Sequence, residues 1–154
     1  MNIIFDLETD GLLPDVSKIH CLAMTVEGAQ ASQIFANEDQ YDNLEEALEL
    51  MSNAEGLVGH NILGYDLPVL RKLLGWTPNK NTKISDTLVV SRLAYSNMMT
   101  LDAQKKYIPT KLYGSHSLKA WGYRLGMLKG DFNNEDTDWS KFTEEMADYC
   151  AQDV

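Results

Sequence analysis

The sequence predicts one α/β domain built on a mixed β-sheet, and three observations lead to that fold class. The chain has 154 residues, 44% apolar and 23% charged, and a chain of this length can bury about 70% of the surface that its unfolded form exposes. Three short apolar runs come first, and strand-like and helix-like patterns alternate after them. Consecutive strands favour an antiparallel meander, whereas βα alternation favours parallel strands, so both pairings are expected in one sheet.

The first third of the chain is expected to form three strands. Residues 2–7 are a β-prone apolar run that stops before the turn residues Asp10 and Gly11. Residues 18–27 and 30–36 follow as two further strands, with Gly28 in the turn between them. These three strands would make the meander.

The middle of the chain alternates helices and strands. Residues 42–53 are expected to form an amphipathic helix, because apolar side chains recur at helical spacing. These apolar positions are Leu44, Ala47, Leu48 and Met51. A short strand at 56–60 lies between glycines, and a helix from about 67 to 74 ends at Gly75, with Pro68 tolerated in its first turn.

The remaining elements are mostly helical. A strand at 82–85 leads into a helix that has Asp86 as its N-cap and extends to about Ser96. Residues 99–114 show no clear periodicity and are expected to be a loop. Helices follow at about 117–126 and at about 140–154. The expected N-cap of the last helix is Ser140.

Composition excludes several classes of protein. No apolar run approaches the ~20 residues of a membrane helix, and the N-terminus lacks the basic region of a signal peptide. The two cysteines, Cys21 and Cys150, show no zinc-site spacing and are expected to be free thiols in a reducing cytoplasm. The net charge is −10, but residues 83–129 carry eight basic and two acidic residues, a local charge of +6. Overall charge therefore does not decide whether the partner is a nucleic acid.

Three acidic patterns could carry chemistry. Asp6 and Glu8 alternate with Leu7 at the end of the first strand, so both side chains would project from one face. Asp66 closes an Asn-x-x-x-Tyr-Asp pattern at a strand-to-helix junction, and Tyr149 and Asp153 are four residues apart in the last helix. An Asp-x-Glu is expected roughly once by chance in this composition. The order and placement of the three patterns are more informative than each alone.

These motifs resemble the three exonuclease motifs of the DEDD superfamily, in its tyrosine-containing subclass. The matching segments are 5–11, 61–66 and 149–153. Residues 86–93 and 114–126 further resemble the proofreading domain of podovirus-type phage family A DNA polymerases. The resemblance covers essentially the whole chain and implies a ribonuclease H-like fold: a mixed sheet flanked by helices, in one 3′→5′ exonuclease domain over 1–154.

The resemblance implies a metal-dependent hydrolysis of the terminal phosphodiester of single-stranded DNA, releasing nucleoside 5′-monophosphates. Converging carboxylates repel one another unless a cation intervenes, and oxygen ligands favour two divalent ions, Mg²⁺ or Mn²⁺. The implied metal ligands are Asp6, Glu8, Asp66 and Asp153. Tyr149 would orient the attacking water, because a phenol with a pKa near 10 is a poor base at neutral pH.

The same resemblance, together with the basic segment, gives candidate substrate contacts. Leu12 would pack against the terminal base, and Asn61 and Tyr65 would contact the strand. His116 lies in the basic segment and could touch a phosphate or serve only in packing. The expected partners are a single-stranded DNA 3′ end and, in the natural context, a family A polymerase domain. The protein is expected to be a monomer in the cytoplasm, that of the host cell if phage-encoded, with no membrane partner.

Two other functions stay open at this point. An RNA 3′-processing exonuclease of the same superfamily would carry the same motifs. A truncated domain that binds nucleic acid or a polymerase without cutting is the non-enzymatic alternative. The chain stops one residue after Asp153, so the end of the last helix is expected to fray.

Overall fold

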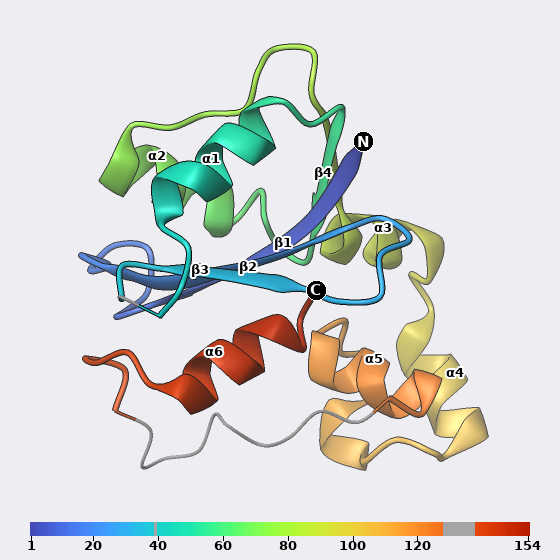
Figure 1. The fold of residues 1–154 in the computed structure, drawn as a ribbon. Helices are drawn as coiled ribbons and strands as arrows, with labels where there is room; N and C mark the ends of the chain where they lie inside the picture. Colours follow the sequence, from blue (N-terminus) through green and yellow to red (C-terminus); the bar gives the residue numbers. More distant parts are fainter. Residues whose placement is uncertain (39, 128–137) are drawn as a thin grey trace.

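The computed structural model describes residues 1–38, 40–127 and 138–154 and confirms the mixed sheet (Figure 1). The sheet has the order β3-β2-β1-β4-β5. Its strands are β1 (Asn2–Thr9), β2 (Ile19–Val26), β3 (Gln33–Ala36), β4 (Gly56–Gly59) and β5 (Lys83–Asp86). β1, β2 and β3 pair antiparallel, whereas β4 pairs parallel with β1 and β5 parallel with β4. The meander with parallel additions is as the sequence predicts.

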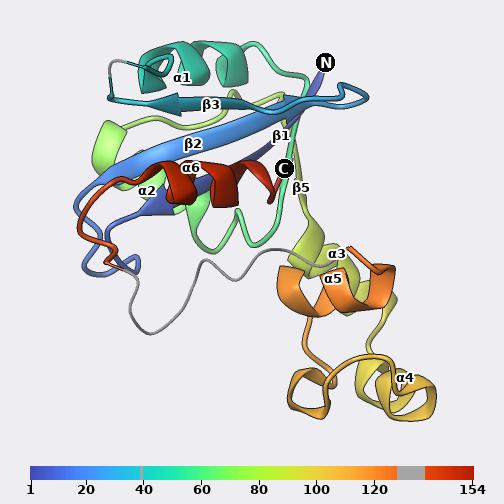
Figure 2. The ribbon, with the colours of Figure 1, turned by 60° about the horizontal axis from the view of Figure 1, so that its bottom comes forward.

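Helices cover both faces of this sheet. They are α1 (Leu44–Ser52), α2 (Asp66–Leu74), α3 (Thr87–Ala94), α4 (Met98–Lys105), α5 (Leu118–Leu125) and α6 (Glu144–Ala151), with a 3₁₀ turn η1 at Thr110–Leu112. α1 and α2 pack on one face, and α6 crosses the other, where it contacts β1, β2 and β3. Figure 2 shows α3, α4 and α5 gathered beyond the β5 edge of the sheet.

The alternation of side chains along the strands explains the two layers of packing. On β1, Ile3, Phe5 and Leu7 point into the larger core beneath α1 and α2. On β2, Cys21 and Ala23 point the other way and pack against Met146 and Cys150 of α6. Asp6 and Glu8 alternate with the core residues of β1 and therefore share the face covered by α6.

The predicted loop at 99–114 is wrong. Met98–Lys105 form α4, and η1 follows at Thr110–Leu112. This segment has no amphipathic pattern because α4 buries only Met98 and Asp102. The helix is stabilised instead by a buried ion pair between Asp102 and Arg124 of α5, with a nitrogen-to-oxygen distance of 2.8 Å. Sequence periodicity cannot report a contact of that kind.

The predicted start and end of the last helix are also wrong. The N-cap is Thr143, whose hydroxyl accepts from the Met146 N–H at 3.1 Å. Ser140 lies in a preceding turn, where its N–H and hydroxyl both donate to the Asp138 carboxylate. The helix ends at Ala151, and Asp153 follows it in a turn, so Tyr149 and Asp153 do not share a helical face as expected.

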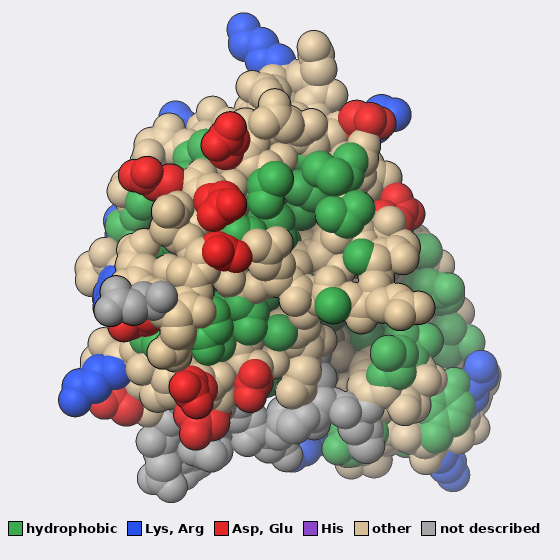
Figure 3. Space-filling model, viewed as in Figure 1, with side chains coloured by type: hydrophobic (Ala, Val, Ile, Leu, Met, Phe, Trp, Pro, Cys, Tyr) green, Lys and Arg blue, Asp and Glu red, His purple; other side chains and the backbone are tan. Residues whose placement is uncertain are grey.

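Charge is distributed unevenly over the surface. Figure 3 shows acidic side chains spread over the face that carries α1 and α6, with exposed apolar side chains over the helices at its lower right. Of the eight basic residues in segment 83–129, Lys129 lies outside the described residues. Within the described part of the chain, every helix is too short or too polar to cross a bilayer.

Candidate active site

The C-terminal end of β1 places two carboxylates next to a thiol. Oxygen atoms of Asp6 and Glu8 and the sulfur of Cys150 all lie within 4.8 Å of one another. The Cys150 Sγ is 3.9 Å from Asp6 Oδ2 and 3.5 Å from the Asp6 main-chain oxygen. Glu8 is 9% exposed, and Asp6 is half-buried. The alternation of β1 therefore brings both predicted acids to one place beneath α6.

Asp66 reaches the same strand from the opposite side of the sheet. Its Oδ1 accepts from the Leu7 N–H at 3.1 Å, between Asp6 and Glu8 in the chain. β4 pairs with β1 only up to Ile4. Beyond that point the Asp66 carboxylate takes a place that a neighbouring strand would occupy. Asp66 thus approaches the three-residue stretch Asp6–Glu8 at Leu7, beside the group formed by Asp6, Glu8 and Cys150.

Burial makes the Asp66 carboxylate costly to ionise. The side chain is 3% exposed, and its pKa is raised to about 7, mainly by this desolvation. The charge of Asp86 also raises the pKa, whereas hydrogen bonds, including that from the Leu7 N–H, lower it. A nearby cation would compensate the ionised form. This environment suits a group that binds a metal ion or shares a proton.

The turn that leads to Asp66 depends on a close backbone approach and on a carboxylate. A Cβ at Gly59 would lie 2.7 Å from the Phe5 main-chain oxygen, so only glycine fits there. Asn61 adopts a left-handed conformation with φ 65°. Asp86 accepts from the N–H groups of Asn61 at 2.9 Å and Leu63 at 3.0 Å. The sequence predicts Asp86 as the N-cap of α3, which the structure confirms, but not this second role.

Tyr149 and Asp153 lie on either side of Cys150 in the chain. Tyr149 is half-buried in α6, one residue before the thiol that contacts Asp6. Asp153 is half-buried beyond the helix end, where its N–H donates to the Cys150 main-chain oxygen at 3.1 Å. Cys150 is therefore one of the residues that dock this end of the chain on the sheet.

Sequence reasoning missed Cys150 because it lies inside the 149–153 segment at a position that the motif of Tyr149 and Asp153 does not specify. The thiol is fully buried, and its pKa is raised well above the ordinary range by its contact with Cys21, by burial and by the charge of Asp6. Cys21 pairs with Glu8 across β1 and β2. A protonated thiol is a poor metal ligand, so the hard oxygen donors remain the ligands available at this site. The pairing of Cys21 with Glu8 across β1 and β2 could have indicated that a thiol lies next to the acids.

Leu12 belongs to the segment that follows β1, and Tyr65, the N-cap residue of α2, contacts that segment. The Tyr65 hydroxyl donates to the Gly11 main-chain oxygen at 2.5 Å and also contacts the Thr9 hydroxyl. Asp10 accepts from the Ser17 and Lys18 N–H groups, so it forms a turn as the sequence suggests. Leu12 is 77% exposed at the tip of this segment. It is available to a substrate, whereas the Tyr65 hydroxyl is directed into the protein.

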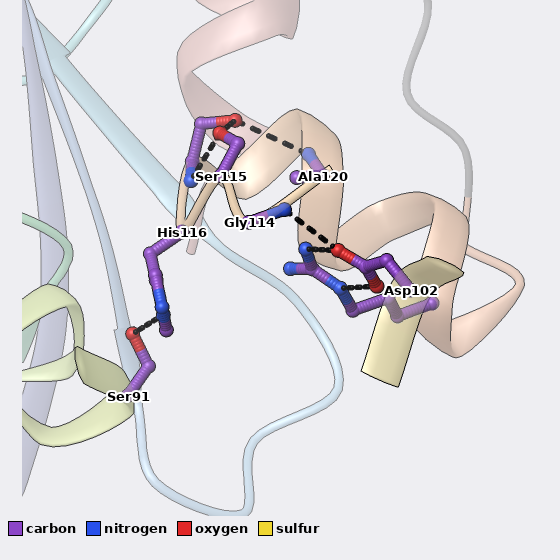
Figure 4. A network of polar contacts seen from close by, with 8 residues as sticks. Ser91, Asp102, Gly114, Ser115, His116 and Ala120 are labelled. Carbon is purple, nitrogen blue, oxygen red and sulfur yellow. Dashed lines mark hydrogen bonds and ion pairs between the residues drawn. The ribbon is translucent and has the colours of Figure 1, made fainter. Parts of the chain in front are cut away.

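His116 lies among the helices beyond β5 (Figure 4). Its Nδ1 is 3.1 Å from the Ser91 hydroxyl of α3, and its ring lies near that of Trp121. Figure 4 also shows the Asp102 carboxylate, which accepts from Arg124 and from the Gly114 N–H at 2.9 Å. Burial and the neighbouring Arg124 lower the pKa of His116. These contacts place His116 in a packed network outside the carboxylate cluster.

The residues present fit a divalent cation. Asp6 and Glu8 offer closely spaced oxygen atoms, and Asp66 has a buried carboxyl group whose ionisation a cation would favour. Carboxylates without nitrogen or thiolate ligands favour Mg²⁺ or Mn²⁺ over Zn²⁺. The site can therefore hold hard cations at the C-terminal end of β1, the central strand, just before the exposed turn that carries Leu12.

Comparison with known proteins gives a family and several relatives. A model of the RNase_H superfamily matches residues 3–154. The DNA-directed DNA polymerase of Escherichia phage T7 is 34% identical over an alignment of 175 positions, which covers 99% of this chain and 25% of the polymerase. The enzyme of Enterobacteria phage T3 is 33% identical with the same coverage. The chain thus spans about a quarter of the length of these relatives.

Solved structures share the fold at lower identity. Brucella melitensis NrnC has a TM-score of 0.66 and 17% identity, with 99% of this chain and 66% of that chain covered. NrnC bound to pGG gives 0.65 and 19%, and NrnC with bound Mg²⁺ gives 0.64 and 20%, each with the same coverage. At this identity the likeness shows a common fold.

Proposed function

The chain belongs to the RNase_H superfamily, and from that membership we propose that it is a metal-dependent 3′→5′ exonuclease acting on single-stranded DNA. The product is a nucleoside 5′-monophosphate released stepwise from the 3′ end. The reaction corresponds to proofreading in a replicative polymerase. Its DNA substrate is supported by the whole-chain similarity to the phage T7 and T3 DNA polymerases.

The observation that supports this proposal is the closeness of Asp6 and Glu8 at the end of β1, with a third acid, Asp66, bonded to the strand beside them. Asp6 and Glu8 have oxygen atoms within 4.8 Å of each other, and Asp66 binds the main chain between them. An acidic centre of this kind needs cations, and cations explain how an acidic domain can act on a polyanion.

Each site residue has a distinct role in this proposal. Asp6, Glu8, Asp66 and Asp153 hold two divalent ions, Mg²⁺ or Mn²⁺. When bound, such ions lower the pKa of a water and stabilise charge on the leaving oxygen. The Tyr149 hydroxyl orients the attacking water. Cys150 docks α6 against Asp6 and keeps that carboxylate in place.

The substrate strand approaches from the side of the exposed turn after β1. Leu12 offers an apolar surface to the terminal base, and stacking of this kind accepts any sequence. Asn61 is exposed in the turn before Asp66 and contacts the strand. Tyr65 acts there through Gly11, to which its hydroxyl is bonded. His116 lies further along the proposed path of the DNA strand. A family A polymerase domain is the proposed partner, in the cytoplasm of an infected cell.

A gel assay with end-labelled DNA tests the function. Single-stranded DNA labelled at its 3′ or its 5′ end is incubated with Mn²⁺ or with EDTA. Immediate release of mononucleotide from the 3′ label, together with a shortening ladder from the 5′ label, supports the proposal. Internal fragments would indicate an endonuclease, and activity that persists in EDTA would contradict the metal dependence.

The matched variant combines Asp6→Ala and Glu8→Ala. The pair is expected to abolish nucleotide release, while circular dichroism shows a folded protein. The control is Glu45→Ala with Glu46→Ala, two acids in the first turn of α1, which removes the same charge away from the site. Parent-level activity in the Asp6/Glu8 variant would show that the site is assigned wrongly.

A matched RNA oligonucleotide completes the assay, because the motifs are shared with RNA-processing enzymes. Competition between DNA and RNA of the same sequence compares kcat/KM directly. We expect DNA to be preferred. A clear preference for RNA would replace proofreading with RNA 3′ processing and leave the metal site unchanged.

A further inference from the structure

The turn that carries Leu12 is attached to the protein at several points. Residues 12–16 form one helical turn, in which the N–H groups of Asp15 and Val16 donate to the Leu12 main-chain oxygen at 2.9 and 2.8 Å. Val16 is buried at 2% exposure, whereas Leu12 is 77% exposed. The backbone of Leu12 is therefore fixed through Val16, and its side chain stays free for contact.

Lys72 of α2 binds the other end of this turn. Its ammonium group donates to three main-chain oxygens, those of Leu13 and Pro14 at 3.1 Å and that of Val16 at 2.9 Å. An ammonium has three N–H donors, so all of them are used. Hydrogen bonds from a charged donor are about twice as strong as neutral ones.

The turn packs on α2 in part, because Leu13 and Val16 share a hydrophobic cluster with Leu67 and Val69 of α2. A cleft of about 580 Å³ lies between them, lined by Leu13 on one side and by Leu67, Pro68 and Arg71 of α2 on the other. Lys72 spans this cleft. Tyr65 is bonded to the start of the segment, at Gly11. Asp10 is bonded to its end, at Ser17.

We propose that Lys72 is a positioning residue that holds the turn so that Leu12 faces the terminal base of the substrate. The same helix begins at Asp66, a proposed metal ligand, and presents Lys72 six residues later. α2 thus sets the separation between the carboxylates and Leu12. This inference rests on the proposed exonuclease function, and it assigns a role to a residue that contacts neither metal nor DNA.

Lys72→Met tests the role with a matched control. Arg71→Met removes one positive charge from the same last turn of α2 without a described contact to residues 12–16. Lys72→Met is expected to lower kcat/KM about tenfold on single-stranded DNA, chiefly through KM, whereas Arg71→Met changes it less than about twofold. An oligonucleotide with an abasic 3′ end offers no base to Leu12, and on it Lys72→Met should have no effect.

A double-mutant cycle separates positioning from a general structural effect. If Lys72 acts through Leu12, then Lys72→Met adds nothing to the loss caused by Leu12→Ala. Additive losses, or an equal loss on the abasic substrate, would overturn the proposal. Thermal unfolding of each variant shows whether the fold is preserved.

Hydrogen exchange gives a readout that needs no catalysis. The Val16 amide is expected to exchange about tenfold faster in Lys72→Met than in Arg71→Met, because the turn opens more often. Unchanged exchange would overturn the inference even if the protein is a nuclease. If the unsubstituted protein releases no nucleotide, the proposed function fails along with the role of Leu12, and the exchange rate still decides whether Lys72 holds the turn.

Discussion

The buried carboxyl group of Asp66 links the local chemistry of one residue to the stability of the protein. Its pKa is raised to about 7, mainly by burial, from an ordinary value of 3.8. The protonated form is therefore favoured in the folded state relative to the unfolded one. A group of this kind stabilises the fold below its unfolded pKa, and that stabilisation is lost as pH rises through the folded value.

We expect the metal-free protein to lose stability between about pH 4 and pH 7. The loss from Asp66 amounts to at most about 4 kcal/mol, because each unit of pKa corresponds to about 1.4 kcal/mol. Asp66→Asn keeps an oxygen that can accept from the Leu7 N–H and does not ionise, so its stability should vary less over this range. Urea unfolding in EDTA at several pH values measures both proteins. Identical pH profiles would show that Asp66 ionises freely in the fold.

Tyr149 is expected to act on the rate of reaction and not on metal binding. Tyr149→Phe removes the hydroxyl proposed to orient water and should lower kcat by about ten- to a hundredfold. Tyr107→Phe, a substitution at an exposed tyrosine, serves as the control. Single-turnover rates at saturating Mn²⁺ measure the effect. A rate equal to that of the parent would remove Tyr149 from the mechanism.

At the scale of the elements, Asp86 connects α3 with the turn before α2, because its carboxylate accepts hydrogen bonds from both. Its carboxylate caps α3 through the Leu88 and Val89 N–H groups and holds the Asn61 and Leu63 N–H groups in the turn before α2. Burial raises its pKa, but these hydrogen bonds outweigh burial, and the net pKa lies below the ordinary value. The position of Asp66, the first residue of α2, therefore depends on Asp86 at the end of β5.

Asp86→Ala should cost about 3 kcal/mol of stability, because an N-cap and two further main-chain bonds are lost. Nuclease activity should fall as well, since the turn that positions Asp66 is released. Asp138→Ala is the control, because its carboxylate holds only an exposed turn at Ser140. Chemical denaturation and the DNA assay measure the two effects. Loss of stability with full activity would show that the turn is held by other contacts.

The elements that sequence predicts well are those with a local signal. β1 and α2 have clear apolar patterns, and α2 ends at Gly75, whose left-handed conformation (φ 66°) favours glycine. α4 was missed because its stability comes from the contact between Asp102 and Arg124, 22 residues apart. The start of the last helix is not predicted correctly because Ser140 and Thr143 are both favoured N-cap residue types.

The candidate site shows the same division between local and distant signals. The pairing of Asp6 with Glu8 on one face follows from strand alternation alone. The contact of Asp66 with the Leu7 N–H, the thiol of Cys150 and the bonds of Lys72 depend on how distant segments pack. A motif can predict which acids lie in a site, but it cannot predict which neutral groups hold them.

The proposed metal site would connect the whole molecule, because the acids assigned to it come from β1, from α2 and from the end of the chain. These segments pack on different faces of the sheet. An ion bound by all of them would join layers that otherwise meet only through the sheet. Metal binding should therefore stabilise the entire fold and not one loop.

We expect Mn²⁺ to raise the melting temperature of the protein. At a free concentration one hundred times the dissociation constant, a ligand that binds only the folded state adds about 2.7 kcal/mol. For a domain of this size that corresponds to roughly 5–10 °C. The shift should grow with the logarithm of the Mn²⁺ concentration and be lost in the Asp6→Ala, Glu8→Ala variant. The melting temperature of the metal-free protein in EDTA is the baseline. Differential scanning calorimetry measures it. A melting temperature unchanged by millimolar Mn²⁺ would mean that the carboxylates do not assemble a metal site.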